Sequence, residues 1–264
     1  MSSLNTLILA AIAVAAPSLA QAASVELKNL YATVEVIPED RVDIAIDMHA
    51  KNGGRRLPTV TRSGDHVVVD GGIHWMTGCK SDWDIGRQAV QITLHTPHDV
   101  HLSTNGSVSG AVRPAKDLDL VTAGCGKWSI GDVSGAFSIH QSGVANIQAG
   151  ATGSANLELS GVTHLDMAAT RNLTVEMSGA GRVKLRSVSG PVKANLSGVG
   201  SVDIASGRAD HVSAEVSGMG GFALHGSAQA LDAEVSGIGN VRVDHVDGPI
   251  HKSVSGIGHI NVGA

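Results

Sequence analysis

The sequence predicts an all-β protein, a β-solenoid (β-helix) with rungs of about 18–20 residues and an N-terminal β-sheet cap. Three observations predict it. A Ser-Gly dipeptide recurs at near-constant spacing, apolar residues alternate with period two around each copy, and aromatic residues make up only 2% of the chain. With 33 glycines and few rings, the core must be filled by Val, Ala, Leu and Ile in thin layers.

The first 22 residues have the pattern of a Sec-type signal peptide. Residues 7–16 form an apolar run too short to span a bilayer, Pro17 ends it, and Ala20–Ala22 supplies the small residues of a cleavage site. The start lacks Lys and Arg, which leaves a buried core segment as the alternative. We expect residues 1–22 to be removed and the mature protein to lie in the periplasm, or to be secreted or displayed on the cell surface.

Residues 23–112 are predicted to form a β-rich cap. Short alternating apolar runs are separated there by polar turns that contain Gly, Asn or Asp. The runs are Val34–Val36, Val42–Ile46, Val67–Val69 and Val90–Leu94, and the turns are Asn52–Gly54, Ser63–Asp65 and Asp70–Gly72. No segment has a helical period, so we expect the cap to consist of strands that merge into the solenoid.

Residues 113–264 are predicted to be β-helix repeats, continuous with the cap in one domain. The Ser-Gly corners begin at Ser142, Ser160, Ser178, Ser197, Ser217, Ser236 and Ser255. The last five extend to Ser-Gly-x-Gly, and Ala123–Gly126 is an earlier variant. Alternation on both sides gives each rung short strands with one buried face. Gly is expected at the corner because it adopts positive φ, and stacked rungs bury a continuous column.

The chain resembles the head GIN domain family, which is labelled an auto-transporter adhesin head. The residues that carry the resemblance are Val34–Ile37, Val42–Ile44, Asp65–Val69, Val90–Leu94 and the Ser-Gly-x-Gly corners. The resemblance covers nearly the whole mature chain and implies an exported, Gly-rich protein built of β-helix rungs. Its motifs are structural, and it implies no catalytic residues and no cofactor.

Cys79 and Cys125 are the two cysteines of the chain. In an exported protein a disulfide between them is the first expectation. Cys125 occupies the x of a Ser-Gly-x-Gly-like corner, so the bridge would join the cap to the first rungs and contribute about 4 kcal/mol in the chain-entropy model. A redox or metal role is the alternative, although the sequence has no CxxC motif.

The three tryptophans, Trp75, Trp83 and Trp128, lie near these cysteines in the sequence. Exposed indoles would form a patch that binds a partner or a glycan. The favoured alternative is that the rings plug the end of the solenoid, as the largest side chains available to it. Both interpretations place the tryptophans at the junction of the cap and the rungs.

Two sets of titratable residues are candidates for ion binding. His95, His98 and His101 are spaced like a metal-ligand cluster, but residues of odd and even number on a strand face opposite sides, so solvated strand ends are favoured. Four glutamates each lie two residues before a corner serine and are expected to form an outer column: Glu158, Glu176, Glu215 and Glu234. A solvated face is favoured over a weak site for divalent cations.

Composition and motifs argue against several function classes. A net charge of −5 disfavours nucleic acid as a partner, and no apolar run after residue 22 is long enough for a membrane span. The sequence has no GxSxG elbow, no HExxH and no phosphate loop. We therefore expect a non-catalytic envelope protein that presents its solenoid surface for interaction or adhesion. The alternatives are a periplasmic module that binds envelope polysaccharide or metal ions, and a β-helix enzyme of an unrecognised type.

The expected partner is an envelope protein or a glycan. A second possibility concerns the last rung, where Ser255–Gly258 is followed by the strand His259–Val262. A terminal rung offers unpaired backbone N–H and C=O groups to another strand. We therefore expect this C-terminal edge of the solenoid to dock onto a second copy, giving a homo-oligomer, or onto a partner protein.

Overall fold

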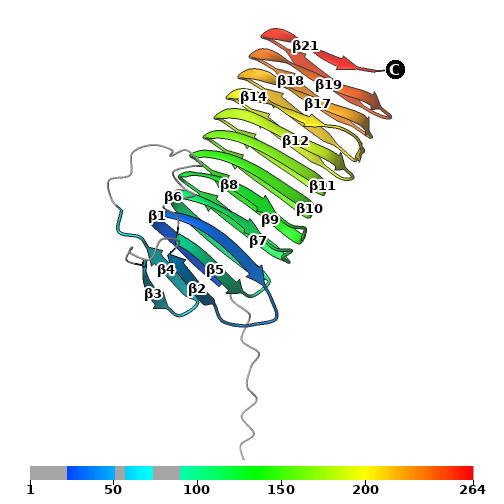
Figure 1. The fold of residues 1–264 in the computed structure, drawn as a ribbon. Coiled ribbons are helices and arrows are strands. Elements are labelled where there is room, and N and C mark those ends of the chain that lie inside the picture. Colours follow the sequence, from blue (N-terminus) through cyan, green and yellow to red (C-terminus); the bar gives the residue numbers. More distant parts are fainter. Residues whose placement is uncertain (1–22, 51–56, 74–89, 264) are drawn as a thin grey trace, which may run out of the picture.

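The computed structural model describes residues 23–50, 57–73 and 90–263, and these residues form strands and turns without a helix. The chain winds through about nine stacked turns, which confirms the predicted all-β solenoid (Figure 1). Five strands lie at the N-terminal end of the stack: β1 (Ala23–Pro38), β2 (Ala45–Ala50), β3 (Thr59–Ser63), β4 (His66–Asp70) and β5 (Val90–Thr96).

The strands of the remaining rungs follow in chain order up the stack. They are β6 (Asp99–Val112), β7 (Asp117–Thr122), β8 (Cys125–Ile130), β9 (Val133–Gln141), β10 (Val144–Leu159), β11 (Val162–Met177), β12 (Ala180–Val188), β13 (Val192–Leu196), β14 (Val199–Ile204), β15 (Arg208–Ala209), β16 (Val212–Val216), β17 (Met219–Ala228), β18 (Leu231–Val235), β19 (Ile238–Val246), β20 (Ile250–Val254) and β21 (Ile257–Val262).

Each regular rung contributes one strand segment before its Ser-Gly corner and one after it, and each set of segments forms a long parallel ladder. We call the first set the pre-corner ladder, which runs from β4 to β20. The second set is the post-corner ladder, which runs from β5 to β21. A short third stretch of pairing joins Thr152 to Thr170 and Thr170 to Val188 on the remaining side. The short strands expected for each rung are thus present, and each strand of these ladders pairs with the strand one rung away.

The core is a set of thin apolar columns inside these ladders. One column of the post-corner ladder has side chains that are at most 3% exposed: Trp128, Ile147, Leu165, Val183, Val202, Phe222 and Val241. Burying an aliphatic or Phe side chain contributes about 1.5–3 kcal/mol. Repetition of such layers, rather than a wide aromatic core, holds the stack together.

The glycines of the Ser-Gly corners correct one expectation. Positive φ occurs at positions such as Asn29 (53°), Gly106 (128°) and Gly207 (130°), whereas Gly218 and the other glycines that directly follow the corner serines do not have it. These glycines are needed for another reason. A Cβ on Gly218 would come closer than 3.0 Å to the carbonyl oxygen of Gly198, the corner glycine one rung below. The corner therefore selects Gly because backbones of successive rungs approach closely there.

The N-terminal end has a chain order that the local patterns do not indicate. β1 lies inside the stack, with β4 and β5 on one side of it and β6 on the other, all parallel. β2 and β3 complete this end as antiparallel partners of β5 and β4. The cap strands thus continue both ladders, and parallel stacking begins well before residue 113 (Figure 1).

Candidate interaction surface

A row of exposed apolar side chains runs along the corner of the solenoid. It consists of the x residues of successive corners, each paired with the x residue one rung away. We call it the apolar ridge: Val144, Val162, Ala180, Val199, Met219, Ile238 and Ile257. All seven are exposed, and the six larger side chains are 46–74% accessible to solvent. Contiguous exposed apolar surface on a folded protein often marks an interaction site.

The alternation of the strands explains why these residues point outward. In β14, Val202 and Ile204 are buried, and Val199 lies at an odd distance from Val202, so its side chain faces the other side of the ladder. Gly198 and Gly200 flank it in the sequence and leave it without side-chain cover from its neighbours in the chain. The ridge therefore protrudes from a floor of glycine backbone.

The two flanks of the ridge differ in charge. On the pre-corner ladder, Glu158 pairs directly with Glu176, and Glu215 with Glu234, while Asn195 separates the two pairs. This confirms the expected outer column of glutamates. On the other flank, the outward residues two places after the ridge are His164, Arg182, Ser201, Gly221, Asn240 and His259. One flank is thus acidic, and the other is neutral to basic.

A shallow hollow of about 680 Å³ lies on the neutral-to-basic flank. Val199 and Met219 form one side, Arg182 and Asn240 contribute to its polar lining, and Gly220 lies in its floor. Because the floor is glycine backbone, the ridge side chains stand above it and are accessible from this side. The ridge side chains Val199 and Met219 are thus accessible from the side of the hollow as well as from above.

The same corner column is buried in the first rungs. Going towards the N-terminus, Val144 pairs with Cys125, Cys125 with Ser107, and Ser107 with Tyr31. Tyr31 is 6% exposed and Ser107 1%, and Cys125 is half-buried. The ridge is thus the exposed part of a column whose N-terminal part is buried.

The inner side of the corner also changes along the stack. In the first rungs it carries the polar side chains of Thr104, Thr122 and Gln141, which are at most 4% exposed and stack on one another. Gln141 Oε1 accepts a hydrogen bond from the hydroxyl of Thr163, whereas Gln141 Nε2 has no hydrogen-bond partner among the described residues. From Leu159 onward the same column is apolar.

Trp128 is the one tryptophan among the described residues, since Trp75 and Trp83 lie outside them. It is only 3% exposed and packs over Gly110, where a Cβ would meet its ring within 3.0 Å. This burial favours the core-filling alternative for Trp128.

A hollow of about 840 Å³ lies beside Trp128 and is also lined by Glu35, Gln91 and Asn146.

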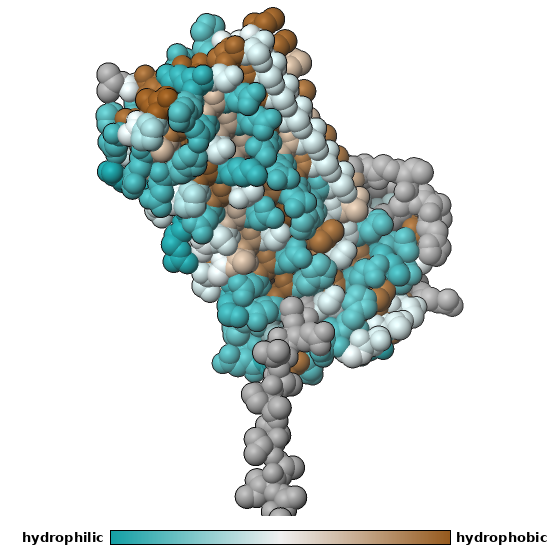
Figure 2. All heavy atoms as spheres, turned by 180° about the vertical axis from the view of Figure 1, so that it is seen from behind, coloured by the Kyte–Doolittle hydropathy of each residue, from teal (hydrophilic) through white to brown (hydrophobic). Residues whose placement is uncertain are grey.

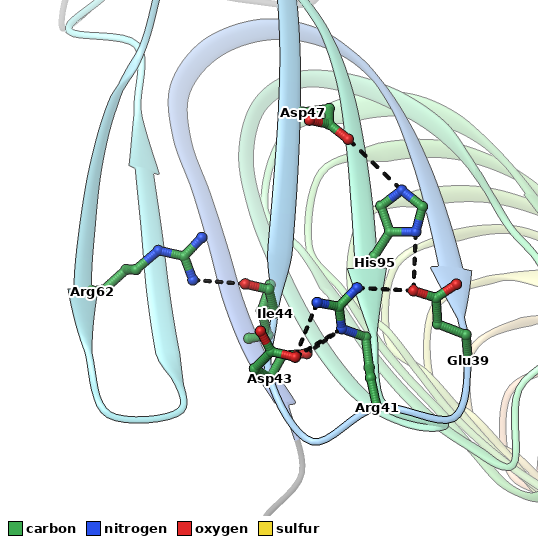
Figure 3. A network of polar contacts seen from close by, with 7 residues as sticks. All are labelled: Glu39, Arg41, Asp43, Ile44, Asp47, Arg62 and His95. Carbon is green, nitrogen blue, oxygen red and sulfur yellow. Dashed lines mark hydrogen bonds and ion pairs between the residues drawn. The ribbon is translucent and has the colours of Figure 1, made fainter.

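The three candidate histidines each face a carboxylate. His95 Nδ1 lies 3.2 Å from Glu39 and Nε2 lies 3.8 Å from Asp47 (Figure 3). His98 Nε2 lies 3.1 Å from Asp40, and His101 Nδ1 lies 2.8 Å from Asp119. Each histidine therefore faces its own carboxylates, and the three side chains do not share one. Within the described ranges, no three His, Cys, Asp or Glu residues are grouped so that they could hold a metal ion.

The network around His95 fixes the turn that follows β1. Arg41 donates to Glu39 at 2.8 Å and to Asp43 at 2.9 Å, so that Glu39 joins Arg41 to His95 (Figure 3). Arg62 reaches across from β3 and donates to the carbonyl oxygen of Ile44 at 2.7 Å. These contacts give His95 a structural role in the cap.

Two carboxylates elsewhere have lowered pKa values. The backbone N–H of Ala136 donates to Asp117 Oδ1 at 2.7 Å and lowers the pKa of that carboxyl. The Arg242 guanidinium, 2.9 Å from Asp244, lowers the pKa of Asp244. The first contact joins successive rungs and the second lies on the solvent face, so both are part of the scaffold.

Cys125 begins β8 on the corner column, and Cys79 lies outside the described residues. The predicted bridge between them stays a prediction. The predicted signal peptide, residues 1–22, also lies outside the described residues. None of the residues that the structure places forms a helix long and apolar enough to cross a membrane.

The last rung is the least covered part of the stack. β20 and β21 pair with β18 and β19 on one side, and no described strand pairs with their other side. Ile250 is 40% exposed, Val254 48% and Ile257 74%, and Figure 2 shows hydrophobic residues at this end. Lys252 occupies the register position that buried Ala233 holds one rung below. A charge at such a position hinders edge pairing, and docking through this edge stays a prediction.

The corner repeats and the rungs they form fit one protein family. The model of the head GIN domain family, described as a putative auto-transporter adhesin, matches residues 80–246. The chain belongs to this family. The match covers all the corners except the last and most of the apolar ridge, so the family connects the solenoid to adhesin-like proteins.

Two solved structures are similar to the chain at low identity. One is a putative adhesin from Bacteroides fragilis, with a TM-score of 0.44 and 14% identity over 92% of each chain. The other is a putative cell adhesion protein from Clostridium sporogenes, with a TM-score of 0.26 and 8% identity over 91% of this chain and 92% of that one. Both TM-scores lie below 0.5. No curated protein matches the chain.

Proposed function

We propose that the protein is a non-catalytic, exported adhesin-like protein that uses the apolar ridge and its flanks to bind a partner in the cell envelope. The single observation that carries the proposal is the exposure of seven successive apolar corner residues on a scaffold whose other outward positions are mostly polar. Membership of a family of adhesin heads supports the same function.

The ridge has features that a purely structural role does not require. In the core columns, Val and Leu side chains such as Leu165 and Val183 have no exposed surface. Val162, Met219 and Ile238 are more than half exposed. A soluble surface would favour Ser or Thr at these places, as at the corner serines. Retaining large apolar side chains in water is explained when a partner covers them.

Export is part of the proposal. Residues 1–22 have the composition of a signal peptide, and a Cys79–Cys125 bridge would suit an oxidising compartment. Intact mass of the protein recovered from the periplasm is expected to start at Ala23 and to be two hydrogens below the mass of the reduced chain. A retained leader would contradict export. Two thiols that react with a maleimide in oxidised protein would contradict the bridge.

The binding proposal is tested on bacterial cells and on a glycan array. Labelled mature protein is compared with the double variant Met219→Asp/Ile238→Asp, and with Ala205→Asp as a matched control on an exposed position outside the ridge. The ridge variant is expected to lose at least tenfold in cell binding, with an unchanged unfolding midpoint. Equal binding by all three proteins would overturn the proposal.

The glycan array distinguishes the alternative function. The hollow beside Trp128 is lined by hydroxyl and amide side chains such as Thr33, Gln91 and Asn146, which suits a polysaccharide. Binding of one glycan class that survives in the ridge variant and is lost in Gln91→Ala would favour this alternative. Binding lost in the ridge variant alone would favour the ridge.

A further inference from the structure

We propose that the occupant of the apolar ridge is a second copy of this chain, aligned side by side and parallel, so that each ridge residue faces its own counterpart. The inference rests on the proposed function, since it names the partner of the same surface. It is distinct from docking through the C-terminal edge, because the ridge runs along the side of the stack and β20 and β21 lie at its end (Figure 1).

The spacing of the ridge residues selects the kind of partner. Neighbouring parallel strands are about 4.8 Å apart, so seven rungs place apolar side chains every ~4.8 Å over roughly 29 Å. An α-helix laid along the ridge repeats every ~5.4 Å, and an extended strand presents one face every ~6.8 Å, so both lose register within a few rungs. A second β-solenoid has the same repeat and stays in register over the whole ridge.

The charges of the flanks select the orientation. A two-fold axis parallel to the stack places the acidic flank of one copy against the neutral-to-basic flank of the other, rung by rung. Glu176 then faces Arg182 of the second copy, and Glu158 faces His164. Glu176 and Arg182 are both exposed. An antiparallel pair would place the glutamate column against itself, which is unfavourable at close range.

The size of the surface sets the strength of the contact. Specific interfaces bury about 800 Å² per partner. A strip one or two side chains wide and roughly 29 Å long lies below that, so the dimer belongs among the weaker specific contacts. We expect a dissociation constant on the order of 10 μM in dilute solution. On a crowded envelope surface such a contact would be populated.

Self-association is measured by sedimentation equilibrium of the full mature protein between roughly 1 and 300 μM, a range that brackets the expected constant. The expected result is a monomer–dimer equilibrium that Met219→Asp weakens at least tenfold and Ala205→Asp leaves unchanged. Unfolding midpoints of both variants confirm that they are folded. A monomer throughout this range overturns the proposal, and so does a dimer that Met219→Asp does not weaken.

Orientation is measured with a short bis-maleimide cross-linker. Val162 and Ile238 are 54% and 53% exposed and lie two rungs on either side of Val199. In the parallel dimer, Ile238→Cys protein cross-links to itself, and a mixture of Val162→Cys and Ile238→Cys gives no heterodimer. In an antiparallel pair centred on Val199, the two Ile238 positions are roughly 19 Å apart and the mixture cross-links instead. The wild type and Ala205→Cys serve as controls.

The two proposals fail in different ways. A protein that stays monomeric, but whose Met219→Asp/Ile238→Asp variant loses cell binding, overturns the second copy as the partner and leaves the ridge as the binding surface. A protein that forms ridge dimers and binds no cells or glycans overturns adhesion to an external partner, while self-association stands. Heterologous cross-links between Val162→Cys and Ile238→Cys overturn the parallel orientation.

Discussion

The corner column of the solenoid can be compared at its two ends. In the first rungs Tyr31 and Ser107 are at most 6% exposed, whereas Met219 and Ile238 in the later rungs are more than 50% exposed. The buried side chains on the inner side of the same corner change as well, from polar at Gln141 in the first rungs to apolar at Leu159 and in the rungs that follow. Backbone pairing along this column is parallel in both regions, so the scaffold is the same and the side chains distinguish a buried end from an exposed end, which we propose are the structural end and the binding end.

The largest expected effect is at the structural end. Tyr31→Ala removes a buried ring and is expected to lower the free energy of unfolding by about 3 kcal/mol. Met219→Ala, at the same column position in the later rungs, is expected to change it by about 0.5 kcal/mol or less. Urea denaturation of both variants measures the difference. Equal losses would show that the two ends of the column do not differ.

The corner glycines give the next largest effect. Gly218→Val places a Cβ against the carbonyl oxygen of Gly198, and since backbone cannot move aside, we expect a loss of about 2 kcal/mol. The neighbouring exposed Ser217→Ala is the control, with a change of about 0.5 kcal/mol or less. Thermal unfolding checks both, and an unchanged midpoint for Gly218→Val would contradict close rung packing at this corner.

The repeat and its register were predictable from the sequence. The Ser-Gly spacing places each corner one rung above the last, and the glutamates fall into a column because they keep a fixed distance from the corner serine. Residue type does not indicate the exposure of the ridge, because Val, Met and Ile are typical of a core. The signal was available in the alternation: Val199 lies three residues before the buried Val202, and an odd separation places it on the opposite face.

Two other features were beyond the local pattern. The position of β1 between β5 and β6 depends on pairing between segments far apart in the chain, which period-two alternation does not specify. The reason for Gly at the corner was expected to be positive φ, but it is the approach of the next rung, a contact visible only once the rungs are stacked. Positive φ is found instead at other positions, such as Asn29, Gly106 and Gly207.

The polar inner corner of the first rungs gives a smaller effect. Gln141→Leu introduces the residue found one rung later at Leu159, but it leaves the buried hydroxyl of Thr163 without its acceptor. We expect a loss of about 1 kcal/mol, and nearly none for Gln141→Leu/Thr163→Val, because both partners are then apolar. Chemical denaturation of the single and double variants provides the test. An additive loss would contradict coupling of the two side chains.

The smallest effect is the contribution of Asp117, in the first rungs, to the dependence of stability on pH. The hydrogen bond from Ala136 lowers the pKa of Asp117 in the folded protein. The stabilisation is therefore complete above the unfolded pKa of about 3.9 and is lost as the pH falls through the folded value. Asp117→Asn is expected to reduce the fall in unfolding midpoint between about pH 5 and pH 2.5. An identical pH profile for wild type and variant would exclude this contribution.

The proposed division of the column into a structural end and a binding end is tested most directly by measuring two quantities on Met219→Asp, namely the unfolding midpoint and the binding to cells. The account predicts that the midpoint stays within the error of the wild type while binding falls at least tenfold, because Met219 contacts solvent in the isolated protein. A midpoint lowered as far as in Tyr31→Ala, or binding equal to that of the wild type, would contradict it.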